Sequence, residues 1–199
     1  HFLFNTLHTV SSFIDEDPPA AQRIIARLSK LLRYALDNTD VQEVPLREEV
    51  RFLRDYLDIQ RLRFEGQLET TVEVSSELHG ALVPSLILQP LVENAVKHGA
   101  TQTDGVGRVT VRARREGKHL LLSVHDNGPG LAPSLTNGSG KNGGVGLRNT
   151  RERLENLYGS DANLSLQPAE GGGLVARIAV PYHTRKDLST TMLSPDGNG

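Results

Sequence analysis

The amino-acid sequence predicts an α+β protein in which a helical N-terminal segment precedes helices packed on one mainly antiparallel sheet. Three observations lead to this fold class. Apolar residues recur at the helical period until about residue 64, and they alternate with polar residues from about residue 67. Helical periodicity returns at about 84–98 and 146–158, between the alternating runs. We therefore expect a helical region at 1–66, an α/β domain at 67–183 and a disordered polar tail at 184–199.

The chain opens with HFLFNTLHTV, which reads as an amphipathic helix. Its period places four apolar residues on one stripe, as expected for a buried face: Leu3, Leu7, Val10 and Ile14. A polar stripe beside it contains His1, Asn5, His8 and Ser12. Taken alone, a histidine in this stripe is best interpreted as part of a solvated helix flank.

Two breaks interrupt the helical region, at DEDPP (15–19) and around 37–45, where Pro45 can open a further helix. That helix carries apolar residues along one side: Val50, Leu53, Leu57 and Leu62. Two such amphipathic helices with short connections form an antiparallel hairpin, which buries little surface alone. We therefore expect it to dimerise into a four-helix bundle or to pack on the following domain.

Five segments alternate as strands do: 68–74, 108–115, 119–126, 163–167 and 173–180. The second and third form a hairpin around EGK, and their inward positions are apolar: Val109, Val111, Leu120, Leu122 and Val124. Residues 131–143 are rich in Gly, Ser and Asn, so we expect a mobile loop there.

Composition excludes several classes of protein. The 37% hydrophobic content over 199 residues excludes disorder throughout, and a net charge of −2 argues against nucleic acid as the main partner. The absence of cysteine removes disulfides, thiol catalysis and zinc–thiolate sites, and it fits a reducing compartment. No apolar run approaches the roughly 20 residues that span a bilayer.

The segment PLVENAVKHG (90–99) is the first of three that could carry chemistry. Its helical period buries Leu91, Val92, Ala95 and Val96, so Glu93, Asn94, Lys97 and His98 crowd onto the remaining surface. A solvated helix face is the simpler interpretation. However, an Asn carboxamide beside Lys and His could hold hydrated Mg²⁺ and neighbouring phosphate oxygens.

The second segment, DNGPG (126–130), follows an apolar strand directly. Asp126 falls on the inward parity, where a carboxylate is costly unless a donor pairs with it. An ordinary turn would account for NGPG alone. An inward carboxylate can instead accept from an exocyclic amine, while Gly128 and Gly130 let the backbone approach a flat ring.

The third segment, GGVGLRNTRERL (143–154), places Gly143, Gly144 and Gly146 before a helix whose free N–H groups could receive phosphates. A flexible lead into a helix is the alternative. The nearby GSGKNG (138–143) matches G-x-G-x-x-G, but it follows a polar loop instead of a strand, so the dinucleotide-binding interpretation fails. Lys141 does not have the Walker spacing either.

In this order, the three segments resemble the N, G1 and G2 boxes of the ATP-binding superfamily shared by gyrase, Hsp90 chaperones, MutL and histidine kinases. HFLFNTL at the front, followed by LSKLLRYAL and YLDIQRLRF, makes the chain similar to LytS/YehU-type sensor histidine kinases from residue 1 to about 182. The resemblance implies a Bergerat-type α/β sandwich behind a two-helix dimerisation and phosphoacceptor segment.

The resemblance also implies roles for individual residues. His1 would be the phosphoacceptor, and Asn94 a catalytic residue and Mg²⁺ ligand, with Lys97 and His98 near the phosphates. Asp126 would bind the adenine amino group in a pocket that Asn127, Gly128 and Gly130 shape. Residues 131–143 would form a lid over ATP. The phosphates would meet Gly144 and the first residues of the helix after it, Val145, Gly146 and Leu147. Asn149 also belongs to the family's pattern.

The implied function is a kinase core that binds Mg²⁺ and ATP, autophosphorylates a histidine and passes the phosphoryl group to a response-regulator aspartate. A homodimer is implied, as is a cytoplasmic location in an inner- or plasma-membrane sensor that reaches the membrane only through an upstream region. An ATPase of the same superfamily is the main alternative, but Pro90 stands where it would carry its water-activating Glu. Glu93 points about 100° away from Asn94 around a helix. A nucleotide-binding pseudokinase is a further alternative.

One departure from the pattern concerns the base that assists the histidine. Many other histidine kinases carry an acidic residue next to the phosphoacceptor, whereas Phe2 follows His1 here. The sequence therefore names no base.

Overall fold

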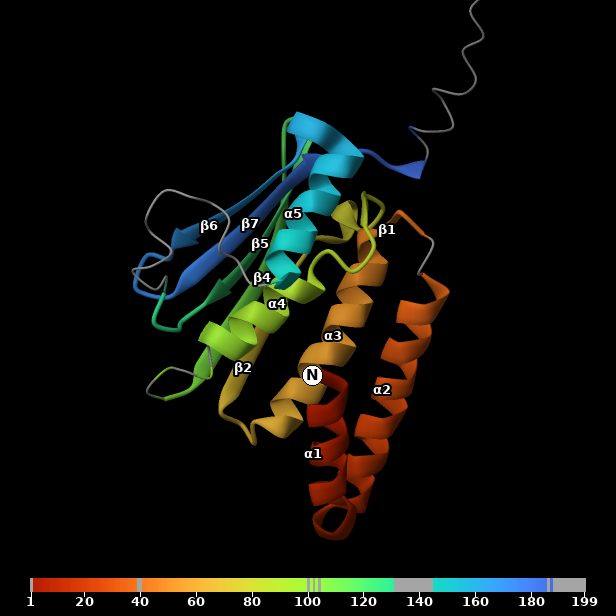
Figure 1. Ribbon diagram of the computed structural model, residues 1–199, viewed down its shortest axis with the longest axis vertical. Coiled ribbons are helices and arrows are strands. Elements are labelled where there is room, and N and C mark those ends of the chain that lie inside the picture. Colours follow the sequence, from red (N-terminus) through yellow and green to blue (C-terminus); the bar gives the residue numbers. More distant parts are fainter. Residues whose placement is uncertain are drawn as a thin grey trace, which may run out of the picture.

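The computed structural model describes residues 2–38, 41–99, 101, 103, 105–130, 145–185 and 187. Its N-terminal part contains three helices, α1 (Phe2–Glu16), α2 (Pro18–Asp37) and α3 (Leu46–Arg63). Asp17 caps α2, because its carboxylate accepts from the amide of Ala20 at 2.9 Å, and Pro18 stands in the first turn. The expected breaks are thus present. Helices α1 and α2 form the hairpin, whereas α3 lies against the sheet (Figure 1).

The rest of the chain forms a five-stranded sheet in the order β2-β4-β5-β7-β6, with β2 and β4 parallel and the other pairs antiparallel. Its strands are β2 (Leu68–Glu73), β4 (Gly107–Glu116), β5 (His119–Asp126), β6 (Asn163–Pro168) and β7 (Leu174–Pro181). The expected inward residues are all buried, which confirms the parity: Val109, Val111, Leu120, Leu122 and Val124.

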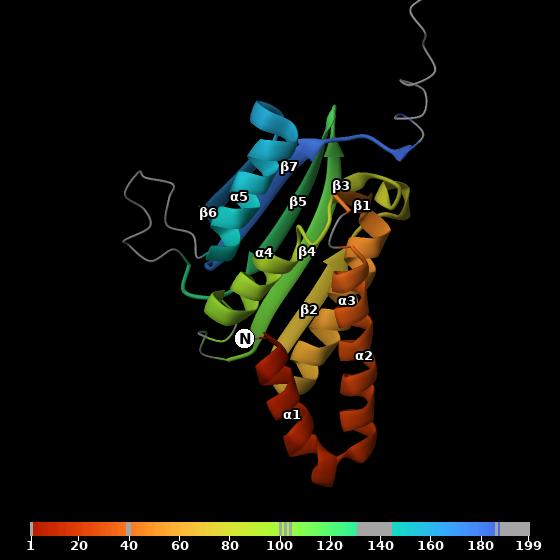
Figure 2. The ribbon, with the colours of Figure 1, turned by 45° about the vertical axis from the view of Figure 1, so that its right-hand side comes forward.

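Helices α3, α4 (Gln89–Asn94) and α5 (Val145–Tyr158) cover one face of this sheet (Figures 1 and 2). A π-helical turn (Ala95–Gly99) continues α4, and short 3₁₀ turns occupy Ser76–Leu78 and Gly159–Asp161. None of the described helices is both long and apolar enough to cross a bilayer. The expected α+β class is confirmed, with the sheet and its helices as two packed layers.

Two short strands that the sequence analysis missed tie α3 to this layer. β1 (Glu43–Pro45), directly before α3, pairs antiparallel with β3 (Leu82–Pro84). One hydrophobic cluster runs from Val10 through α3 to Val180 in β7. The boundary predicted between residues 66 and 67 crosses this cluster, and the division into domains stays a prediction.

The expected buried stripe of α1 is wrong for this single chain. Leu3, Leu7 and Ile14 are 37%, 48% and 52% exposed, and only Val10 of that stripe is buried. The buried face is instead rotated toward α2 and α3 and includes Thr6, Thr9 and Val10. The polar stripe is exposed as expected at Asn5, His8 and Ser12, while His1 lies outside the described residues.

Candidate functional site

Asp126 ends β5 and is 7% exposed, between Val109 of β4 and Leu174 of β7 in the sheet register. The amide of Gly128 donates to its Oδ1 at 3.0 Å. Burial raises the pKa of Asp126, while hydrogen bonds from the amides of Gly128 and Leu174 oppose that rise. The carboxylate is therefore oriented by the fold, at the place where the sequence predicts an acceptor for an exocyclic amine.

The carboxamide of Asn127 makes two hydrogen bonds with the backbone. Its Oδ1 accepts from the amide of Arg108 at 2.6 Å, and its Nδ2 donates to the carbonyl of Val106 at 3.0 Å. These two bonds fasten the turn after β5 to the start of β4. Asn127 thus supports the position of Asp126 through its contacts with the backbone.

Two glycines let the turns around Asp126 pack closely. Gly130 has a φ of +80°, and a Cβ there would lie 3.2 Å from the carbonyl oxygen of Gly173. Gly173 has a φ of +92°, and a Cβ there would overlap the carbonyl oxygen of Asp126 and lie 2.8 Å from its carbonyl carbon. The sequence analysis missed Gly173. The available signal was the run of three glycines before a strand that could neighbour the one ending in Asp126.

The helix that carries Asn94 has the two faces that the sequence predicts. Leu91, Val92, Ala95 and Val96 are buried, Asn94 is half-buried and Lys97 is exposed. The helix widens into the π turn directly after Asn94, a local distortion that is common at functional sites. The side chain of His98 lies outside the described residues.

The start of α5 lies against the start of α4. A Cβ on Gly146 would be 3.5 Å from Cβ of Pro90, an ordinary contact, and Thr150 Oγ1 donates to the carbonyl of Gly146 at 2.9 Å. Leu147 is buried in the core, whereas Val145 is 66% exposed. Leu147 could therefore meet a ligand only through its backbone. Asn149 is exposed, and Gly144 and the predicted lid at 131–143 lie outside the described residues.

A cavity of about 640 Å³ joins several of these segments. It is lined by residues of α1, α3, the α4 helix with its π turn, and α5: Asn5, Tyr56, Gln60, Arg63, Phe64, Glu93, Val96, Lys97, Thr101, Val145 and Gly146. Asn5 follows His1 by one helical turn in sequence, so the first helix begins beside the N-box and G2-box segments. In Figures 1 and 2 the start of α1 accordingly lies close to α4 and the end of α3.

Three of these lining residues come from α3 and a fourth, Phe64, is its C-cap; none of them was given a role from the sequence. Tyr56, Gln60, Arg63 and Phe64 belong to YLDIQRLRF, which was noted only as part of a resemblance. Tyr56 and Gln60 are 3% and 1% exposed. Their helical spacing, at i, i+4, i+7 and i+8, was the signal that could have grouped them on one face.

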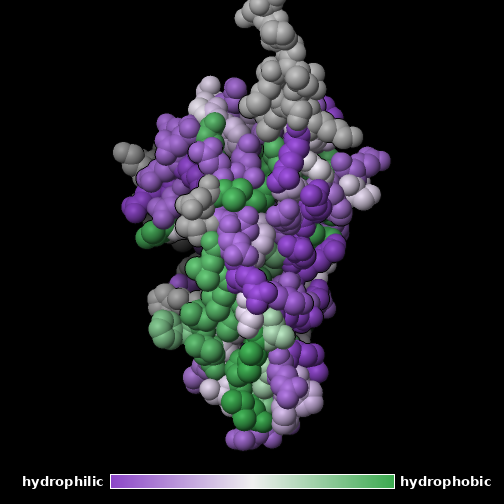
Figure 3. All heavy atoms as spheres, turned by 90° about the vertical axis from the view of Figure 1, so that its right-hand side faces the viewer, coloured by the Kyte–Doolittle hydropathy of each residue, from purple (hydrophilic) through white to green (hydrophobic). Residues whose placement is uncertain are grey.

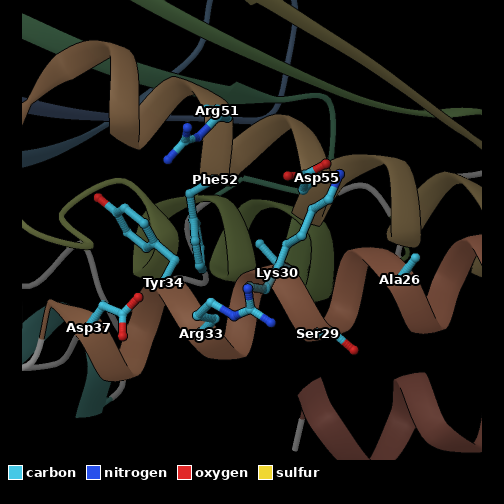
Figure 4. A pocket seen from close by; sticks show the side chains of 10 residues that line it. Ala26, Ser29, Lys30, Arg33, Tyr34, Asp37, Arg51, Phe52 and Asp55 are labelled. Atoms are coloured by element: carbon cyan, nitrogen blue, oxygen red, sulfur yellow. The ribbon is translucent and has the colours of Figure 1, made fainter.

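A second cavity, of about 680 Å³, lies between α2 and α3 (Figure 4). Tyr34 and Phe52 lie side by side there, with ring centroids 5.2 Å apart. It contains none of the site residues that the sequence predicts. Its size alone therefore does not make it a nucleotide site.

A buried carboxylate of α3, Glu49, fixes the start of α4. Its Oε1 accepts from the amide of Leu86 at 2.6 Å, and its Oε2 accepts from the amide of Leu88 at 3.3 Å. Leu86 has a φ of +57°. Leu88 is the N-cap residue of α4, and its own apolar side chain cannot accept a capping hydrogen bond. Burial raises the pKa of Glu49 to about 7, although these amides and nearby Arg153 lower it.

Arg153 of α5 holds the same segment from the other side. Its Nη1 donates to the carbonyl of Ser85, and its Nη2 donates to the carbonyl of Gln42 at 3.1 Å. The Ser85 amide also donates to that Gln42 carbonyl, at 3.1 Å. The helix with Asn94 is thus attached to both α3 and α5.

The donor set fits ATP and Mg²⁺. A buried carboxylate beside closely packed glycine backbone suits an adenine, and Lys97 and Arg63 provide positive charge for phosphates. Among the described residues, no group of three or more His, Cys, Asp or Glu could hold a metal ion. Mg²⁺ commonly needs only one or two protein ligands when substrate phosphates and water complete its shell. Asn94 could be such a ligand.

Comparisons with known proteins agree with this geometry. A histidine kinase family model matches residues 1–68, and a model of histidine kinase-, DNA gyrase B- and HSP90-like ATPases matches residues 82–184. Sensor histidine kinase BtsS of Escherichia coli K12 is 37% identical over 166 residues, 83% of this chain and 28% of that protein. Sensor protein LytS of Oceanobacillus iheyensis is 32% identical over 197 residues, 94% of this chain and 34% of that protein. The chain thus spans about a third of the length of these relatives.

Solved structures share the fold. The catalytic domain of histidine kinase ThkA aligns with a TM-score of 0.55 at 19% identity, over 70% of this chain and 94% of that chain. ThkA in complex with the response regulator protein TrrA aligns with a TM-score of 0.55 at 18% identity, over 90% of this chain and 58% of that chain.

Proposed function

Because this chain belongs to the LytS- and BtsS-type sensor histidine kinases of two-component signalling, we propose that it transfers the γ-phosphoryl group of ATP to His1 and then to a response-regulator aspartate. The observation that carries this proposal is the buried, oriented carboxylate of Asp126 at the end of β5, next to glycine backbone. The ATP-binding domain of the family is recognised in residues 82–184.

In the proposed mechanism, Asp126 accepts a hydrogen bond from the adenine amino group, and Gly128, Gly130 and Gly173 leave room for the ring. Backbone amides at 144–147, before and at the start of α5, meet the phosphates. Asn94 is a ligand of Mg²⁺, which supplies positive charge to the phosphate oxygens when bound. Lys97 and His98 add donors.

His1 acts as the nucleophile in this proposal. An imidazole with an ordinary pKa of about 6.5 is largely neutral at cellular pH, so a ring nitrogen has a lone pair for attack on the γ-phosphorus. The cavity that Asn5 shares with Lys97, Val145 and Gly146 supports this role, because it connects the first helix to the nucleotide segments. The ATPase alternative lacks its expected base, since Pro90 stands four residues before Asn94.

We further propose that the chain works as a homodimer. The α1–α2 hairpin exposes apolar side chains that a second hairpin would cover: Leu3, Phe4, Leu7, Ile14, Ile25, Leu32 and Leu36. Figure 3 shows apolar residues gathered over this end of the molecule. A response regulator is the proposed phosphoryl acceptor because ThkA, which shares the fold, was solved with one. A cytoplasmic position, with a membrane anchor supplied by an upstream region, completes the proposal.

The experiment is a nucleotide titration combined with a phosphorylation assay. Asp126→Asn should weaken binding of a fluorescent ATP analogue several-fold to a hundredfold, about 1–3 kcal/mol, because an amide N–H would face the adenine amine. Asp161→Asn, an exposed site in the Gly159–Asp161 turn, is the control. An unchanged dissociation constant for Asp126→Asn would remove this residue from the site.

Phosphorylation distinguishes the remaining assignments. Asn94→Ala should still bind nucleotide but lose transfer, because Mg²⁺ placement fails. His1→Gln should eliminate acid-labile, alkali-stable phosphate, whereas His8→Gln should retain it. If His8→Gln loses the label instead, the phosphoacceptor assignment is wrong.

A further inference from the structure

We propose that Arg63 binds the γ-phosphate of ATP directly and is a catalytic residue of the phosphoryl transfer. The inference rests on the proposed function and adds a residue from α3, which lies outside the three boxes. Its basis is the position of one guanidinium in the cavity that connects the first helix to the nucleotide segments.

Arg63 lines that cavity and is half-buried at the end of α3. Among the described residues it forms no ion pair with a carboxylate. Its Nη1 donates to Gln60 Oε1 at 3.4 Å, and its guanidinium carbon lies 4.7 Å from the centre of the Phe64 ring. By contrast, Arg61 on the same turn is paired with Asp58 at 3.3 Å and donates to the carbonyl of Thr70. Arg63 thus keeps most of its donors available.

The side chains beneath Arg63 hold it in place. Gln60 is 1% exposed, so the oxygen that accepts from Arg63 belongs to a fixed, buried group. Phe64 restricts the guanidinium further, because an arginine over an aromatic face is held by cation–π attraction. Little side-chain entropy then remains to be lost when Arg63 binds an anion.

The charges that line the cavity favour an anion. Among the described lining residues, Arg63 and Lys97 are cationic and Glu93 is acidic, which leaves one net positive charge. Glu93 Oε1 accepts from Nε2 of Gln89 at 2.7 Å, which holds this carboxylate on its own helix. Arg63 and Lys97 come from different helices, so they can contact different oxygens of one phosphate. A planar guanidinium matches a phosphate group bidentately, which a single ammonium cannot do.

The position of the cavity indicates that the γ-phosphate of ATP, and not the α- or β-phosphate, would lie near Arg63. Asn5 in the cavity wall follows His1, the proposed acceptor, by four residues in sequence, whereas Asp126 does not line the cavity. The phosphate that leaves for the histidine is the one that must enter this space. Phosphoryl transfer depends mainly on positioning and charge stabilisation, and an arginine on the transferring group supplies both.

Calorimetric titration with Mg²⁺ and either ADP or a β,γ-imido analogue of ATP tests the proposal. Arg63→Gln, which removes the guanidinium and its charge but keeps a polar amide, should weaken the ATP analogue about tenfold to a hundredfold. Its affinity for ADP, which lacks the γ-phosphate, should stay within about twofold. The initial rate of histidine phosphorylation at saturating ATP should fall at least about tenfold. Arg54→Gln, an exposed arginine of the same helix, should change neither affinity nor rate.

Arg63→Lys keeps the charge and serves as the second variant if Arg63→Gln unfolds. It should recover part of the preference for the ATP analogue over ADP. Equal weakening of both nucleotides would show that Arg63 only packs α3, and unchanged affinities would remove it from the site; either result overturns the proposal. If the unmodified protein binds neither nucleotide, the proposed function itself is wrong.

Discussion

Helices α1 and α3 are both amphipathic, but they are buried to very different extents. In α1, Leu3, Leu7 and Ile14 are between 37% and 52% exposed. In α3, residues on two sides are covered, and even the polar Glu49 and Gln60 are 1% exposed. Helical periodicity therefore identifies an apolar stripe without telling what will cover it. Helix α3 lies between α2 and the sheet, whereas the exposed stripe of α1 is proposed to meet a second chain.

The largest expected difference between the two helices comes from one substitution made in each. Leu57→Ala should lower the free energy of unfolding by about 2–5 kcal/mol, because Leu57 is 2% exposed and a cavity would remain. Leu7→Ala, at a residue 48% exposed, should cost less than about 1 kcal/mol in the single chain. Urea denaturation of dilute protein measures both. Equal losses would mean that α1 is as firmly packed as α3.

An ionisable group inside α3 sharpens the comparison through pH. Because burial raises the pKa of Glu49 to about 7, the folded protein holds a proton that the unfolded chain releases near pH 4.5. The stabilisation from this proton is fully present below pH 4.5 and is lost as pH rises through about 7. Between pH 5 and pH 8 the loss should be on the order of 2 kcal/mol.

Glu49→Gln should remove that part of the pH dependence, because the amide does not titrate in this range. The polar groups that face Glu49 are Tyr34 of α2 at 3.5 Å, the amides before α4, and Arg153 of α5. Burial raises the pKa of Tyr34 further above its ordinary value, so this group stays neutral between pH 5 and 8. Glu48→Gln is the matched control and should keep the slope. Chemical denaturation at several pH values measures it, and an identical slope in Glu49→Gln would contradict the assignment.

The smallest effect on the fold of one chain should come from Leu7→Asp. An exposed carboxylate on α1 should change the free energy of unfolding by less than about 1 kcal/mol. It should nevertheless abolish dimers at micromolar concentration, because a charge would be buried in the interface between hairpins. Sedimentation velocity distinguishes these outcomes, with His8→Asp on the neighbouring polar stripe as control. An undiminished dimer would mean that the two chains associate elsewhere.

Much of the fold followed from sequence because its signals are local. The five long strands, the faces of the Asn94 helix and the inward parity around Val111 and Leu122 depend on periodicity, and all are confirmed. Strands β1 and β3 were missed because segments of three residues are too short to alternate. The face of α1 was misassigned because its cover depends on partners that periodicity does not specify.

The candidate site was predicted in the same uneven way. Asp126 could be identified as a candidate site residue because a carboxylate at an inward position, among apolar residues, is costly unless a donor pairs with it. Gly173 and the cavity residues of α3 could not, because each matters through a neighbour that is distant in sequence. The roles of all the candidate site residues stay predictions, and His1, the side chain of His98, Gly144 and the lid at 131–143 also lie outside the described residues.

The order of strands in the sheet has a consequence for how the kinase matures. Helices α4 and α5 both lie in connections between strands far apart in sequence, β2 to β4 and β5 to β7, whereas β4–β5 and β6–β7 are hairpins. Long connections close more slowly than hairpins, so strand structure should form on refolding before nucleotide binding appears. Stopped-flow circular dichroism, run beside a fluorescent ATP analogue, should show this lag; simultaneous signals would contradict it. A chain emerging from the ribosome could then bind no nucleotide until Leu174–Pro181 had been synthesised, so the site would stay silent while the strands before it are being made.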